Sequence, residues 1–236
     1  MNILMITYNP TGRGTYFRAY QFARELGLLQ HSVTLLTTAP TRKTGIKFWE
    51  EEGIQIVEFP AILQGGARSG WDLLNIYSRL SWLNSKSFDI VYGFESRPSV
   101  IYPALKLAHR GIPLVLDWCD WFGKGGSVEE RPNPILRLLL RPFETYFENH
   151  FRKNAKATSV ISNTLYQRAL DLGVNQETLT LIPNGFNIPG WKPIRKSHAR
   201  INLGFPEDEF IIGYVGSLFP KDAILLSRAF SLVHMS

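Results

Sequence analysis

Two glycines and an arginine, Gly12, Arg13 and Gly14, stand between an apolar segment and a helical pattern near the start of the chain. A glycine turn lets backbone N–H groups approach an anion, and the positive end of the following helix adds to the attraction. Arg13 can supply a bidentate contact with a phosphate. These residues predict either a contact with a phosphate or another substrate group, or only a tight strand-to-helix turn with Thr15 as its N-cap.

A dinucleotide fingerprint needs a third glycine at position 17, where this chain has Phe17. We expect that side chain to block the close helix–strand approach that glycine allows. The second apolar segment ends in "LLTTAP", without the acidic residue that binds a ribose in dinucleotide enzymes. Both features count against a nucleotide-dependent oxidoreductase, which stays as a less favoured alternative.

Three carboxylates, Glu95, Asp117 and Asp120, follow two apolar segments that we expect to be neighbouring strands. Carboxylates facing a cleft at such an edge can accept hydrogen bonds from a substrate or orient a nucleophile, so we predict catalytic roles for all three. Trp118 and Trp121 can stack on a substrate ring, and we predict that Trp118 contacts the substrate. The alternative is that Asp117 caps its loop and both tryptophans pack in the core.

Short β-branched segments alternate with longer helical patterns over residues 1–187, which predicts βαβ units. The fold class is therefore α/β, a doubly wound Rossmann-like parallel sheet whose ligands bind where strand ends meet helix starts. We expect strands at 2–8, 32–37, 54–59, 88–94, 113–118, 157–162 and 179–183, and helices at 16–29, 71–83, 99–109, 134–156 and 164–172.

The pattern changes at residues 188–209, which are rich in proline and glycine and show no periodicity. We expect a linker or hinge there, with Asn184 and Gly185 forming the turn that leads into it. Residues 210–236 then repeat the opening order of apolar strand, glycine turn and helix. This predicts the start of a second Rossmann-like domain, far short of the roughly 100 to 150 residues of a typical domain, so we expect a truncated chain.

Several segments resemble those of GT-B glycosyltransferases of family 4, and they occur in the same order. They are the opening βαβ through "HSVTLLT", "FDIVYGFES", "GIPLVLDWCDW", "ENHFRKNAKATSVISN", "LIPNGFN" and "YVGSL". Each is weak alone; the most specific are "IPNG" at a strand end and "YVGSL" after the linker. The resemblance covers essentially the whole chain.

This resemblance implies transfer of a sugar from a nucleotide-sugar donor to a glycan or lipid-linked acceptor, with retention and with neither metal nor cofactor. It places the acceptor on the N-terminal domain and the donor diphosphate near Gly216, Ser217 and Lys221, although Ser217 replaces the usual arginine and Lys221 falls one residue early. The usual histidines near the carboxylates are also missing. The family's donor-binding E-x7-E motif would lie beyond residue 236, so a non-catalytic acceptor-binding remnant is a second alternative.

A net charge of +6 suits anionic partners, and no recognition motif points to nucleic acid. The basic and apolar residues of 131–156 suit an anionic membrane surface, but we favour an ordinary helix that packs its apolar stripe on the sheet. Cys119 is the single cysteine, so no disulfide partner is expected, and no histidine spacing suggests a metal site. We expect a cytoplasmic protein, with peripheral contact at the inner face of the membrane as the alternative.

Overall fold

Eight strands form one sheet in the computed structural model, which describes residues 1–42, 44–63, 70–185, 192–215 and 220–234. The chain divides into two units, residues 1–185 and 186–236, and the sheet belongs to the first. The strands are β1 (Asn2–Pro10), β2 (Ser32–Thr38), β3 (Lys47–Glu51), β4 (Ile54–Phe59), β5 (Ile90–Phe94), β6 (Leu114–Trp118), β7 (Ala157–Val160) and β8 (Leu179–Leu181).

The strand order is β3-β4-β2-β1-β5-β6-β7-β8, and every neighbouring pair is parallel except β3 with β4. The chain therefore starts in the middle at β1, builds one side of the sheet, and returns to build the other from β5. In open α/β sheets, ligands bind where the order reverses in this way. The loops after β1 and β5 lie at that point, and the predicted α/β fold class is confirmed.

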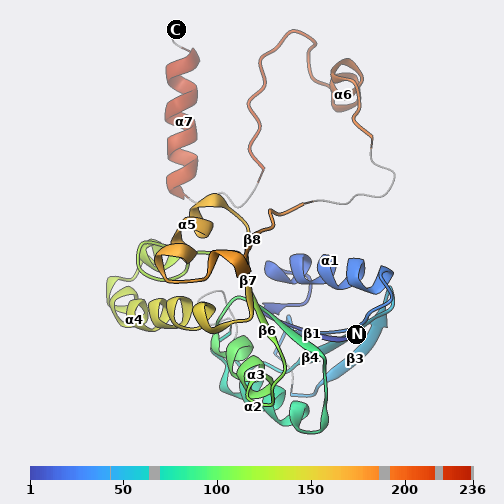
Figure 1. Ribbon diagram of the computed structural model, residues 1–236. Helices are drawn as coiled ribbons and strands as arrows, with labels where there is room; N and C mark the ends of the chain where they lie inside the picture. The colour runs from blue at the N-terminus through green and yellow to red at the C-terminus, as the bar shows by residue number, and fades with distance from the viewer. Residues whose placement is uncertain (43, 64–69, 186–191, 216–219, 235–236) are drawn as a thin grey trace. The chain divides into compact units, whose positions relative to one another are not determined.

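Five α-helices connect the strands in the described part of this unit: α1 (Thr15–Leu28), α2 (Leu73–Trp82), α3 (Pro98–Ala108), α4 (Pro134–His150) and α5 (Asn163–Asp171). Helix α1 lies on one side of the sheet and α2 and α3 lie on the other (Figure 1). Strand β1 supplies both cores, because Ile3 and Met5 pack with α1 while Leu4 and Ile6 pack with α3. This alternation is the period-2 pattern of a strand buried on both faces.

Strand β3 was not expected from the sequence. It is an exposed edge strand that pairs antiparallel with β4 through a turn at Glu52 and Gly53, which have φ angles of 50° and 76°. Two successive residues with positive φ are typical of a type I′ hairpin. Gly53 was the available signal, but the polar sequence around Trp49 hid the strand.

Helix α4 differs from the favoured prediction for residues 131–156, a helix that packs its apolar stripe on the sheet. Its inward face carries Glu144 and Glu148 beside Phe147, all three buried. Large apolar side chains of the same helix face solvent instead: Ile135, Leu136, Leu138, Leu139, Phe143 and Tyr146 are between 41% and 71% exposed. The expected arrangement of apolar residues inward and charges outward is therefore wrong for much of this helix.

The second unit contains α6 (Lys196–Leu203) and α7 (Pro220–His234). The expectation that the linker lacks periodic structure is wrong, because α6 lies within it and ends at Gly204, which has a left-handed conformation. The expected strand at 210–215 is also wrong. Those residues have no partner strand among the described residues, and a strand depends on a neighbour for its backbone hydrogen bonds.

Candidate functional site

The loop after β1 contains the glycine turn. Gly14 has a φ of 54° and stands at the N-cap position of α1, which one of the two alternatives had given to Thr15. The capping side chain is that of Asn9. The Asn9 side-chain oxygen accepts from the Thr15 N–H at 3.3 Å and also from the Thr15 hydroxyl. Phe17 is 57% exposed, so it does not obstruct the helix–strand contact as the sequence suggested. Gly12 and Arg13 are exposed at the sheet edge, so the guanidinium is accessible, while the Arg13 N–H donates to the Pro10 carbonyl at 3.1 Å.

Replacing Gly14 with alanine is expected to destabilise the protein by about 2 kcal/mol, because the new Cβ would lie 2.5 Å from Asn9 Nδ2 and disturb the cap. Gly12→Ala is the matched control: it also has positive φ, but no atom lies within 4 Å of its Cβ position, so we expect about 1 kcal/mol. Urea unfolding followed by circular dichroism measures both values. Equal losses would contradict the role given to Asn9.

Asp117 lies inside the end of β6 and is completely buried. Arg18 of α1 donates to both carboxylate oxygens at 2.9 Å in a bidentate pair, and Ser159 and the Cys119 thiol donate to the same group. The same guanidinium reaches the carbonyl of Ile182 at 2.8 Å and Asn184 Oδ1 at 3.0 Å. The predicted hinge residue Asn184 is thus tied to α1, and Asp117 is fully occupied by donors.

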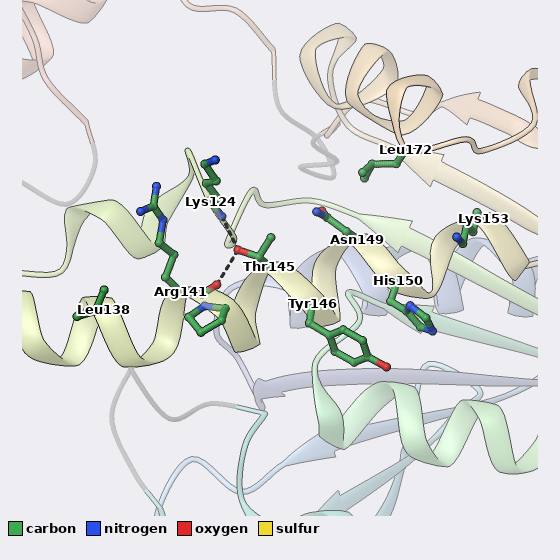
Figure 2. A pocket seen from close by; sticks show the side chains of 10 residues that line it. Lys124, Leu138, Arg141, Thr145, Tyr146, Asn149, His150, Lys153 and Leu172 are labelled. Atoms are coloured by element: carbon green, nitrogen blue, oxygen red, sulfur yellow. Dashed lines mark hydrogen bonds between the residues drawn. The ribbon is translucent and has the colours of Figure 1, made fainter.

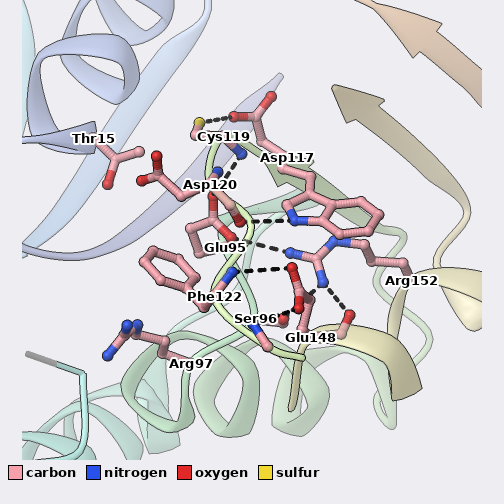
Figure 3. A network of polar contacts seen from close by, with 12 residues as sticks. Thr15, Glu95, Ser96, Arg97, Asp117, Cys119, Asp120, Phe122, Glu148 and Arg152 are labelled. Carbon is pink, nitrogen blue, oxygen red and sulfur yellow. Dashed lines mark hydrogen bonds and ion pairs between the residues drawn. The ribbon is translucent and has the colours of Figure 1, made fainter. Parts of the chain in front are cut away.

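Glu95 follows β5 in a left-handed conformation with a φ of 70°. Its carboxylate accepts from the N–H groups of Cys119 and Asp120 at 2.5 and 2.9 Å, and it pairs with Arg152 at 3.1 Å (Figure 3). Burial raises the pKa of Glu95 to about 8, while Arg152 and the two N–H groups oppose that shift. These contacts hold the Glu95 backbone in its strained left-handed conformation and fix the position of the loop that contains Asp120.

Asp120 is the one exposed carboxylate of the three. Its carboxylate makes no hydrogen bond with another described residue, and partial desolvation raises its pKa, with Arg97 opposing the rise. Burial raises the pKa of the Tyr8 hydroxyl. Arg97 and the Thr15 hydroxyl oppose this rise, and the charges of Glu95 and Asp120 add to it. The loops after β1, β5 and β6 therefore bring polar groups together at the point where the strand order reverses.

Three basic residues that organise this site were not predicted from the sequence. Arg18, Arg97 and Arg152 are each at most 7% exposed by side chain and each pairs with a carboxylate. Arg97 also lies over the rings of Phe122 and Tyr8, at 4.2 and 5.0 Å. No local sequence pattern marks these three residues, although arginine is the cation that suits buried bidentate and stacked contacts.

The remaining predicted site residues differ in their placement. Trp118 has no exposed surface, and its N–H donates to the carbonyl of Asp120. Its ring therefore packs in the core, which was the alternative interpretation, and it has no exposed face on which a sugar could stack. Gly185 ends the first unit. Gly216 and Ser217 lie outside the described residues, as does the side chain of Lys221.

The described residues contain neither a metal-binding cluster nor a membrane-spanning helix. No group of three His, Cys, Asp or Glu side chains there is arranged to hold a metal ion. None of the helices in the same part of the chain is both long and apolar enough to span a bilayer.

Residues 13–188 match the sequence profile of Glycosyltransferase Family 4, and the chain belongs to this family. The profile covers both the glycine turn from Arg13 onward and all three candidate carboxylates. A search of curated protein sequences gave no match.

Solved structures with the GT-B fold share the architecture of this chain. A glycosyltransferase from Rickettsia africae has 16% identity and a TM-score of 0.50, over 88% of this chain and 50% of its own. Anabaena HepE in complex with UDP and glucose has 16% identity and a TM-score of 0.46, over 86% of this chain and 50% of its own. UDP-GlcNAc 2-epimerase from Methanocaldococcus jannaschii has 11% identity and a TM-score of 0.46, over 78% of this chain and 45% of its own. The chain spans about half the length of these structures, and the likeness to the Rickettsia africae structure establishes the fold alone.

Proposed function

We propose that this chain is the acceptor-side half of a glycosyltransferase that moves a sugar from a nucleotide-sugar donor to a glycan or lipid-linked acceptor. Family membership supports the reaction class. The observation that carries the site is the exposed Asp120 carboxylate, held by Glu95 beside the glycine turn where the strand order reverses. We further propose retention of configuration and no requirement for a bound metal.

Within this proposal, Asp120 orients the acceptor hydroxyl, because an unoccupied carboxylate can accept its hydrogen bond and its proton. Gly12 and Gly14 leave backbone N–H groups accessible to an anionic or polar substrate group, and Arg13 adds a charge-assisted contact. Glu95 and Asp117 act as positioning residues: Glu95 holds the Asp120 loop, and Asp117 holds α1 through Arg18. Gly216, Ser217 and Lys221 are proposed to approach the donor diphosphate.

The test is nucleotide release from a panel of nucleotide sugars, by this chain and by the product of the complete coding sequence that contains it. We expect release by the complete product, undiminished by EDTA, and retained anomeric configuration in the product sugar by NMR. Absence of release with every donor would reject the transferase. Acceptor binding by calorimetry without release would instead favour an acceptor-binding module.

A further inference from the structure

The outward face of α4 combines exposed apolar side chains with a neighbouring basic groove. Leu138 and Leu139 are 71% and 60% exposed, and Ile135 and Phe143 extend the same apolar surface. From Pro134 to Phe143 the helix contains arginines but no acidic residue. An ordinary surface helix has the opposite polarity, with its apolar stripe toward the core.

The buried charges explain why this helix stays in place with its apolar side outward. Glu148 accepts from the N–H groups of Phe122 and Gly123 at 3.1 and 2.7 Å. Glu144 pairs with Arg131 at 3.1 Å and with Arg97 at 3.4 Å. Polar contacts therefore hold the inward face, and the leucines are left for contact with another surface.

A groove of about 780 Å³ runs beside the apolar face, and its lining includes Lys124, Arg141, His150 and Lys153 but no acidic residue (Figure 2). Arg141 is paired with Glu129 at 2.8 Å. Lys124 and Lys153 are exposed and form no ion pair with another described residue. The groove thus presents two available ammonium groups to an anion next to Leu138, which also lines it.

We propose that the outward face of α4 docks on an anionic phospholipid bilayer, with Leu138, Leu139 and Phe143 entering the interface and Lys124 and Lys153 contacting lipid phosphates. Apolar residues flanked by cations are the composition that binds such surfaces. A second copy of this chain fits less well, because it would bring the same positive groove against this one. This proposal does not depend on transferase activity.

The test is flotation of the chain with vesicles of phosphatidylcholine containing about 30% phosphatidylglycerol, compared with phosphatidylcholine alone. We expect binding to the anionic vesicles that weakens with added salt. Leu138→Ser with Leu139→Ser should lower the bound fraction about tenfold or more, because two apolar side chains leave the interface. Lys124→Gln with Lys153→Gln should weaken binding to anionic vesicles only.

Matched controls lie elsewhere on the same unit. Leu28→Ser with Leu29→Ser removes two leucines that are 72% and 68% exposed, and it should leave binding unchanged. Lys47→Gln with Lys86→Gln is the corresponding charge control. Circular dichroism checks that each variant folds. The proposal is overturned if the parent chain does not float with anionic vesicles, or if variants and controls lose vesicle binding equally. A dimer that depends on Leu138 and forms without vesicle binding would also overturn it.

Discussion

Replacing Arg152 with methionine is expected to destabilise the first unit by about 3 to 5 kcal/mol. Arg152 and Glu95 are each 1% exposed, and the guanidinium also donates to Ser96 and lies 4.2 Å over the Trp118 ring. Methionine keeps much of the apolar contact with Trp118 but leaves the Glu95 carboxyl buried without its cation. The free energy of unfolding in urea at pH 9, above the pKa of about 8 of Glu95, measures the loss.

The double variant Glu95→Gln with Arg152→Met separates the ion pair from the packing. The glutamine that replaces Glu95 can still accept from the N–H groups of Cys119 and Asp120, and neither charge remains buried. We therefore expect the double variant to be more stable than the sum of the single losses predicts, by about 2 kcal/mol. Lys153→Met, at an exposed neighbouring position, should change stability by about 0.5 kcal/mol or less. A loss below about 1 kcal/mol for Arg152→Met would contradict the importance of the pair.

Asp120→Asn is expected to lower the kcat for nucleotide release by about 100-fold in the complete product. The amide keeps the size of the side chain but cannot take the acceptor proton. Protein stability should change little, because the Asp120 carboxylate is exposed and makes no hydrogen bond with another described residue. Steady-state kinetics with saturating donor and acceptor provide the measurement.

Asp171→Asn is the matched control for Asp120→Asn, since Asp171 is an exposed aspartate at the end of α5. It should keep the parent activity. Unchanged kcat in Asp120→Asn would refute the assignment of Asp120 while leaving the transferase intact. Loss of release in both variants would point to a general effect of the substitution instead.

Most of the fold could be predicted because each buried strand shows its own pattern. Strands such as β1 and β4 are short apolar runs between turns, and the helices between them show apolar residues at helical spacing. The approach of Glu95 to the β6 end was also predictable, because parallel neighbours end at the same edge of a sheet. The edge strand β3 was missed because it is exposed on both faces and has no buried pattern.

The sequence could not predict which of the three carboxylates remains exposed and unpaired among the described residues, because the arginines that pair with the other two are distant in the sequence. Arg18 is 99 residues from Asp117, and Arg152 is 57 residues from Glu95. Nothing in the local sequence distinguishes these arginines from surface cations. The orientation of α4 was misjudged for the same reason, since the groups that hold Glu148 inward are backbone N–H groups of a loop about 25 residues earlier.

The Arg18 contacts also set the order in which the first unit can be completed during synthesis. Arg18 is made early, yet its bond to Asn184 spans 166 residues, and the acceptor at Ile182 is almost as far along the chain. Until those residues leave the ribosome, the guanidinium lacks acceptors that it has in the finished fold, and β8 has not joined β7. Strand β1 is therefore among the first parts to be made, while the neighbouring helix α1 is among the last to complete its tertiary contacts.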